Sequence, residues 1–130
     1  MIAVLDASAA VDMLVRGPRT DRVRQTVAGL ELCAPQLVDL EVASALARLE
    51  RAGTIDAAAA EKAIKAWSDA PVRRTDPPGL ARRAFASRAN LRVADAFYAA
   101  LAIQLAVPLV TTDSRLAAAP APGLTVTLIN

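Results

Sequence analysis

Apolar positions along the chain alternate between short continuous runs and longer stretches with helical spacing. Met1–Leu5 and Leu109–Thr112 are short apolar runs typical of strands that are buried on both faces. We expect further strands at Leu30–Ala34, at Val72–Thr75 and at Leu124–Ile129, each next to a proline or glycine that marks a turn. The pattern therefore predicts five short strands distributed along the whole chain.

Between these runs, apolar residues recur every three or four positions and predict helices. Capping residues, prolines and glycines set the approximate ends. The helices are expected at Ala9–Val15, Thr20–Ala28, Pro35–Ala52, Asp56–Ala70, Asp76–Ala89, Ala94–Ala106 and, as a brief turn, Ser114–Ala119. Strands that alternate with helices indicate an α/β fold with a short, largely parallel sheet sandwiched between helices. We expect one domain over residues 1–130.

Four acidic residues interrupt apolar segments, where an isolated charge is costly. Asp6 and Asp113 follow predicted strands, whereas Glu41 and Asp95 lie in predicted helices. Because the carboxyl ends of parallel strands converge at one edge of a sheet, Asp6 and Asp113 are expected to meet there. Buried carboxylates are commonly stabilised by a cation or a metal, so the four acids suggest one shared cationic partner. Helix capping is the competing interpretation for the three aspartates.

Glu41 belongs to a polar stripe on the longest predicted helix. Members of this stripe recur every three or four residues, beside the apolar face that centres on Leu46: Glu41, Ser44, Arg48 and Arg51. Glu41 can therefore point into a cleft. Asp39 is offset from Glu41 by about 200° around the helix, so both cannot face the same site. We expect Asp39 to be solvated or ion-paired.

The amino-acid composition excludes several kinds of catalytic and metal-binding site. The chain has no histidine and a single cysteine, Cys33, which excludes histidine-dependent triads, a cysteine-based metal site and an internal disulfide. Fifteen basic against 13 acidic residues leave a net charge of +2, too small to indicate nucleic-acid binding by itself. Met1–Leu14 lacks the basic start of a signal peptide, and no charge-free stretch has the length of a membrane span. We expect a cytoplasmic protein without a membrane contact.

The four carboxylates form an all-oxygen ligand set, which suits Mg²⁺ or Mn²⁺ and not zinc or copper. Such ions can activate water and neutralise charge on a phosphodiester, so hydrolysis of a phosphodiester needs no histidine here. Ser8, two residues after Asp6, and Thr112, next to Asp113, carry hydroxyls that can hold metal-bound water or orient the carboxylates. Turn or cap roles are the alternative for both hydroxyls.

Two further classes of function stay open. In an aspartyl phosphotransferase, Asp6 would be the nucleophile and Asp113 a metal ligand. Such chemistry benefits from a nearby lysine, whereas Lys62 and Lys65, the two lysines of the chain, lie in an alanine-rich predicted helix. The second alternative is a catalytically silent module that binds RNA or protein.

Four segments taken together resemble the PIN-domain ribonucleases: Val4–Ser8, Leu40–Leu46, Ala94–Ala102 and Val110–Leu116. Their order and spacing cover essentially the whole chain, and its length is similar to that of VapC-type toxins from type II toxin–antitoxin pairs. The resemblance implies a Mg²⁺- or Mn²⁺-dependent endoribonuclease. Its catalytic and metal-binding residues would be Asp6, Glu41, Asp95 and Asp113.

The resemblance also implies partners, namely an RNA substrate, a second copy of the chain in a homodimer and an antitoxin protein whose tail covers the acidic cleft. An apolar strip of Leu40, Ala43 and Ala47, outside the main core face of its helix, could serve such contacts. Several arginines are candidates for contacts to RNA phosphates: Arg48, Arg51, Arg73, Arg74, Arg82, Arg83 and Arg115.

Overall fold

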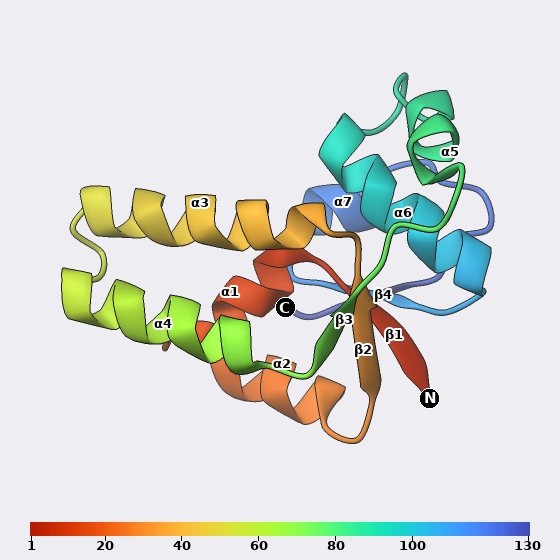
Figure 1. The fold of residues 1–130 in the computed structure, drawn as a ribbon. Coiled ribbons are helices and arrows are strands. Elements are labelled where there is room, and N and C mark those ends of the chain that lie inside the picture. The colour runs from red at the N-terminus through yellow and green to blue at the C-terminus, as the bar shows by residue number, and fades with distance from the viewer.

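The structure, a computed structural model, describes residues 1–130 and contains one five-stranded sheet with helices packed around it (Figure 1). The strands are β1 (Ile2–Leu5), β2 (Glu31–Ala34), β3 (Val72–Arg74), β4 (Leu109–Thr111) and β5 (Val126–Leu128). Their order across the sheet is β3-β2-β1-β4-β5, and every neighbouring pair is parallel. The predicted α/β fold is therefore confirmed, and the sheet is parallel throughout.

Seven helices connect the strands. They are α1 (Ala7–Leu14), α2 (Thr20–Val27), α3 (Leu37–Arg51), α4 (Ala57–Asp69), α5 (Leu80–Ala86), α6 (Val93–Leu105) and α7 (Ser114–Ala118). In Figure 1, α3 and α4 run side by side as a hairpin, whereas α5 and α6 pack together on the other side of the sheet. None of these helices combines the length and the apolarity needed to cross a bilayer.

Helix α5 differs most from the prediction, which extended it from Asp76 to Ala89. The helix begins only at Leu80, because Gly79 at its cap has a φ of 82°, in the left-handed region outside helical geometry. It ends at Ala86, three residues earlier than predicted. Propensity alone could not locate these ends, since the alanine- and arginine-rich sequence on either side suits a helix equally well.

The strand order contains a switch point between β1 and β4. The chain runs outward from β1 to β2 and β3 on one side, and β4 and β5 follow on the other side. Right-handed connections place the helices of these two halves on opposite faces of the sheet. In open parallel sheets, ligands bind beside the carboxyl ends of the strands at such a point. Asp6 directly follows β1 and Asp113 follows β4 at this position.

The hydrophobic core is one cluster of 26 buried residues that includes the central strands and one side of most helices. Helix α6 is buried on most of its circumference, as its nearly continuous apolar sequence predicted. Trp67 and Tyr98 are the largest fully buried side chains, each 1% exposed. Burying such large apolar side chains is the main stabilising contribution in a domain of this size.

Asp39 connects three elements on the outer side of α3. Its Oδ1 accepts hydrogen bonds from Trp67 Nε1 of α4, at 2.7 Å, and from Arg74 Nε of β3, at 3.1 Å. The Arg74 guanidinium also lies over the Trp67 ring, 4.5 Å from its centroid. The expectation that Asp39 is ion-paired, on a different side of the helix from Glu41, is confirmed.

Replacing Asp39 with alanine should lower the free energy of unfolding by about 1–3 kcal/mol, because the buried Trp67 N–H loses its acceptor. Urea denaturation followed by Trp67 fluorescence measures this change. The matched control is Asp69→Ala, which removes only an exposed pair with Lys65 and should cost less than about 0.5 kcal/mol. Equal losses in the two variants would contradict the role assigned to Asp39.

Candidate active site

A cleft of about 490 Å³ opens at the carboxyl ends of β1 and β4. All four acids singled out in the sequence line it, and they come from four different parts of the fold. Asp6 follows β1, Glu41 lies on α3, Asp95 lies on α6 and Asp113 caps α7. The structure therefore brings together side chains that are separated by up to about a hundred residues in the sequence.

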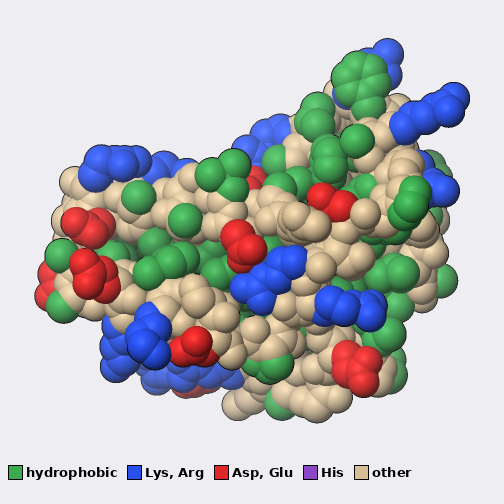
Figure 2. Space-filling model, in the orientation of Figure 1, with side chains coloured by type: hydrophobic (Ala, Val, Ile, Leu, Met, Phe, Trp, Pro, Cys, Tyr) green, Lys and Arg blue, Asp and Glu red, His purple; other side chains and the backbone are tan.

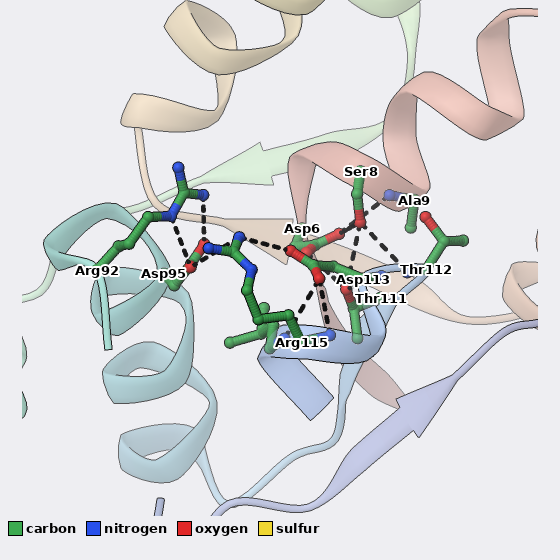
Figure 3. Close-up of polar contacts among 10 residues, drawn as sticks. Asp6, Ser8, Ala9, Arg92, Asp95, Thr111, Thr112, Asp113 and Arg115 are labelled. Carbon is green, nitrogen blue, oxygen red and sulfur yellow. Dashed lines mark hydrogen bonds and ion pairs between the residues drawn. The ribbon is translucent and has the colours of Figure 1, made fainter. Parts of the chain in front are cut away.

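Asp6 is 4% exposed and is held by neutral donors on both carboxylate oxygens (Figure 3). Its Oδ1 accepts from Ser8 Oγ at 2.7 Å and from Ala9 N at 3.0 Å, and its Oδ2 accepts from Thr111 Oγ1 at 2.7 Å. Asp6 thus caps α1 and lines the cleft, so the two interpretations of this residue are compatible. Burial raises the pKa of Asp6 above its ordinary value, although these hydrogen bonds act in the opposite direction.

The hydroxyls beside Asp6 come from Ser8 and Thr111, and not from Thr112 as expected. Thr112 contributes its backbone N–H to Ser8 Oγ at 3.2 Å. Thr111 is the last residue of β4 and is fully buried, so the pairing of β4 with β1 directs its side chain towards Asp6. Two adjacent threonines precede Asp113 in the sequence, and only the strand pairing decides which hydroxyl reaches the carboxylate.

Asp95 and Asp113 are paired with arginines (Figure 3). Arg92 donates to both oxygens of Asp95, from Nε at 3.0 Å and from Nη2 at 3.1 Å. Arg115 Nη2 lies 3.0 Å from Asp113 Oδ2 and 3.8 Å from Asp95 Oδ2, so one guanidinium spans the two carboxylates. One cation shared by all four acids was expected, whereas this structure has an arginine side chain shared by two of them.

The competing interpretation as helix caps holds for only part of the site. Asp113 caps α7, since its Oδ1 accepts from the backbone N–H groups of Arg115 and Leu116. Burial acts to raise the pKa of Asp113, but these hydrogen bonds together with the Arg115 guanidinium lower it below its ordinary value. Asp95 is not a cap, because α6 begins two residues earlier and Arg92 occupies the cap position.

Glu41 is half-buried and faces Tyr98 across the cleft. Its Oε1 accepts a hydrogen bond from Tyr98 Oη at 2.7 Å. Tyr98 itself is 1% exposed, and burial together with the contact to Glu41 raises the pKa of its hydroxyl. The phenol therefore stays protonated and donates a hydrogen bond to the carboxylate.

The donor set of the cleft fits a hard divalent cation. The acids that line the cleft offer only oxygen atoms, the ligands that Mg²⁺ and Mn²⁺ prefer. No three of them are gathered as a ready-made metal cage. Mg²⁺ does not require one, because it keeps several waters and is usually bound by one or two carboxylates together with substrate phosphates. Asp6 is buried without an arginine or lysine partner, so no side-chain cation competes with such an ion for its carboxylate.

The arginines proposed for RNA contacts divide into two groups. Arg48 lines the cleft and Arg115 contacts two of its acids. The others do not line the cleft, and Arg74 is already paired with Asp39. On the face shown in Figure 2, basic and acidic side chains are interspersed and form no continuous positive stripe. Any contact to RNA phosphates at this site is therefore restricted to a few arginines at the cleft.

Sequence reasoning missed three side chains of the site: Arg92, Tyr98 and Thr111. Arg92 and Tyr98 each lie three residues from Asp95. Side chains three residues apart share one face of a helix, so this spacing was a usable signal once Asp95 was a candidate. For Thr111 the sequence held no such signal, because its direction depends on the pairing of β4 with β1.

Comparisons with known proteins identify the family of the chain. The PIN domain family model matches residues 3–122. The chain is 41% identical to Ribonuclease VapC3 of Mycobacterium tuberculosis, over 89% of this chain and 85% of that protein. It is 42% identical to Ribonuclease VapC9 of the same organism, over 87% of each chain. This protein belongs to the PIN domain family.

Two solved structures share the fold. The structure of PAE2754 from Pyrobaculum aerophilum matches with a TM-score of 0.68 and 28% identity, covering 97% of this chain and 83% of that one. VapBC2 from Rickettsia felis, bound to a DNA fragment from its promoter, matches with a TM-score of 0.72 over the full length of both chains. At 14% identity, this second likeness concerns the fold alone.

The aspartyl phosphotransferase alternative gains no support from the site. Lys62 and Lys65 lie on α4 and do not line the cleft, so no lysine is available to balance phosphate charge there.

The raised pKa of Asp6 predicts a pH dependence of stability. Above the unfolded pKa of 3.8, the unfolded chain releases the Asp6 proton while the folded protein still holds it, so this residue's contribution to stability falls as pH rises through the folded pKa. The free energy of unfolding of the wild type, minus that of Asp6→Asn, should therefore decrease with rising pH in that window. Urea denaturation in EDTA over several pH values measures this difference, and a constant difference would contradict the assignment.

Proposed function

We propose that this chain is an endoribonuclease that hydrolyses RNA phosphodiesters and acts as the toxin of a type II toxin–antitoxin pair. The observation that carries the proposal is the convergence of Asp6, Glu41, Asp95 and Asp113 in one cleft. Identity of 41% to a ribonuclease over nearly the whole chain supports the same reaction class. Metal-dependent hydrolysis of a phosphodiester requires no histidine, and the chain has none.

We further propose that the cleft binds Mg²⁺ or Mn²⁺, with ligands drawn from these four carboxylates. When bound, such an ion would supply activation of the attacking water and neutralisation of charge on the scissile phosphate. The protein's own contribution is to hold the acids in place. Asp6 is fixed by three hydrogen bonds before any ligand arrives, so its orientation costs no rearrangement during the reaction.

The arginines at the cleft complete the proposed reaction site. Arg115 forms ion pairs with two of the proposed metal ligands, Asp95 and Asp113. Binding of a divalent ion therefore competes with these ion pairs. Its guanidinium and that of Arg48 are suited to bind the RNA backbone, because a planar fork of N–H donors matches phosphate oxygens. The site thus combines acids for the metal with arginines for the polyanionic substrate.

An antitoxin protein is the proposed regulatory partner. The relation to VapC ribonucleases supports such a partner, and the solved VapBC2 structure shares the fold over its full length. A basic side chain of the antitoxin could pair with the acids of the cleft, because Asp6 has no arginine partner of its own.

A homodimer stays a prediction from the resemblance, and light scattering of the purified chain tests it. Leu40, which is 70% exposed on α3, is available for either contact.

Purified, antitoxin-free protein should cleave RNA in Mg²⁺ or Mn²⁺ and lose cleavage in EDTA. Asp6→Asn and Asp95→Asn should each lower the cleavage rate by at least about 100-fold, because a weakened metal site loses several kcal/mol of transition-state stabilisation. Asp69→Asn, which changes an exposed acid on α4, is the control and should cleave at the wild-type rate. Gel assays with structured and unstructured RNA measure these rates.

The same assay distinguishes the alternative functions. Cleavage that persists unchanged in Asp6→Asn would remove the proposed site. Metal-independent binding of RNA without turnover would indicate a silent binding module. Covalent labelling of Asp6 by a phosphate donor would indicate a phosphotransferase.

Arg48→Ala should weaken binding of single-stranded RNA and lower the slope of log K against log salt by about 0.7, the value for one lost phosphate contact. Fluorescence anisotropy with the Asp95→Asn variant as background measures binding without cleavage. Lys65→Ala removes the same charge from α4, outside the cleft, and is the matched control. An equal change of slope in both variants would show that Arg48 acts only through net charge.

A further inference from the structure

Helix α6 presents two side chains to the cleft, and only one of them is an acid. Asp95 and Tyr98 lie three residues apart on this helix, and both line the cleft. The Tyr98 ring is buried in the core, while its hydroxyl emerges beside Glu41 of α3 and donates to Oε1 at 2.7 Å. A residue of the core thus contacts one of the four acids directly.

Glu41 is held differently from the other three acids. Asp6 is fixed by three neutral donors, whereas Asp95 and Asp113 are paired with guanidinium groups. Glu41 has no arginine or lysine partner within ion-pair distance, and Tyr98 supplies its one side-chain hydrogen bond. A neutral phenol orients a carboxylate without cancelling its charge, so the carboxylate of Glu41 can still attract a cation.

The two carboxylate oxygens of Glu41 differ in their hydrogen bonding. Oε1 is engaged by the phenol, which leaves Oε2 free of side-chain hydrogen bonds. A glutamate has one more rotatable bond than an aspartate and loses more conformational entropy when it is fixed. A hydrogen bond from a rigid, buried ring therefore has a larger ordering effect at Glu41 than at the shorter acids.

We propose that Tyr98 is a positioning residue that orients Glu41, so that Oε2 is the oxygen offered to a divalent cation in the cleft. The inference rests on the proposed metal-dependent function. Partners that hydrogen-bond a metal ligand fix its orientation, and their removal typically lowers metal affinity by about 10- to 100-fold. The competing explanation is that Glu41 merely satisfies a buried phenol, in which case removal of the hydroxyl changes stability alone.

Tyr98→Phe removes only the hydroxyl and keeps the buried ring. Mn²⁺ binding to the full chain, measured by calorimetry and by the electron paramagnetic resonance of free Mn²⁺, should weaken by about 10-fold or more. The matched control is Thr20→Val, which removes another buried hydroxyl, hydrogen-bonded to Val15 O and outside the cleft. It should bind Mn²⁺ as the wild type does.

A double-mutant cycle shows whether Tyr98 acts through Glu41. In the Glu41→Gln background, Tyr98→Phe should cause little further loss of Mn²⁺ affinity, because the carboxylate that it orients is absent. Additive losses in the double variant would overturn the inference. Wild-type affinity in Tyr98→Phe would overturn it as well.

A spectroscopic measurement avoids any substitution of Tyr98. Tyr98 is the only tyrosine of the chain, so protein labelled with ¹³C at the tyrosine Cζ gives a single resonance for the phenol. This resonance should shift on titration with Mg²⁺ and should lie at a different position in Glu41→Gln. No response to Mg²⁺ in a protein that binds the ion would count against the inference.

The outcomes separate the inference from the function on which it rests. If the wild type binds no Mn²⁺, or binds it equally well after Asp6→Asn, the proposed metal site fails and the inference fails with it. If binding depends on Asp6 but not on Tyr98, only the role of Tyr98 is wrong.

Discussion

The parallel pairing of β1 with β4 is the constraint on which the candidate site depends. It joins two segments about a hundred residues apart and aligns Leu5 with Val110, so that the residues after both strands leave the sheet at the same edge. The Thr111 hydroxyl then reaches Asp6 from a distance of 105 residues in the sequence. Because the two halves of the sheet diverge from this pair of strands, α3 and α6 are free to contribute Glu41 and Asp95 from either side.

Charge compensation at the cleft is uneven, and this has a physical basis in how each acid is placed. Asp95 and Asp113 are paired with arginines close to them in sequence, since Arg92 precedes Asp95 by three residues and Arg115 follows Asp113 by two. Asp6 lies at a strand end surrounded by core residues, and only backbone and hydroxyl donors reach it. Of the four acids, Asp6 and Glu41 therefore lack a cationic partner, whereas Asp95 and Asp113 already have one.

Much of the fold and of the site could be predicted from the sequence, because both depend on local patterns. Short apolar runs predicted all five strands, and the polar stripe on α3 predicted that Glu41 points into a cleft, as the structure shows. The failures concern features that only tertiary contacts decide. Thr111 and Thr112 are equivalent in sequence until strand pairing selects one of them, and the start of α5 depends on the backbone conformation of Gly79.

The guanidinium of Arg115 between Asp95 and Asp113 has a consequence for the protein when no divalent ion is bound. Clusters of carboxylates normally repel one another when a metal is withdrawn, and many such sites collapse or unfold. Here a resident cation stays tethered to the same polypeptide and takes up the negative charge. When no divalent ion is bound, this guanidinium therefore limits the repulsion between the two carboxylates.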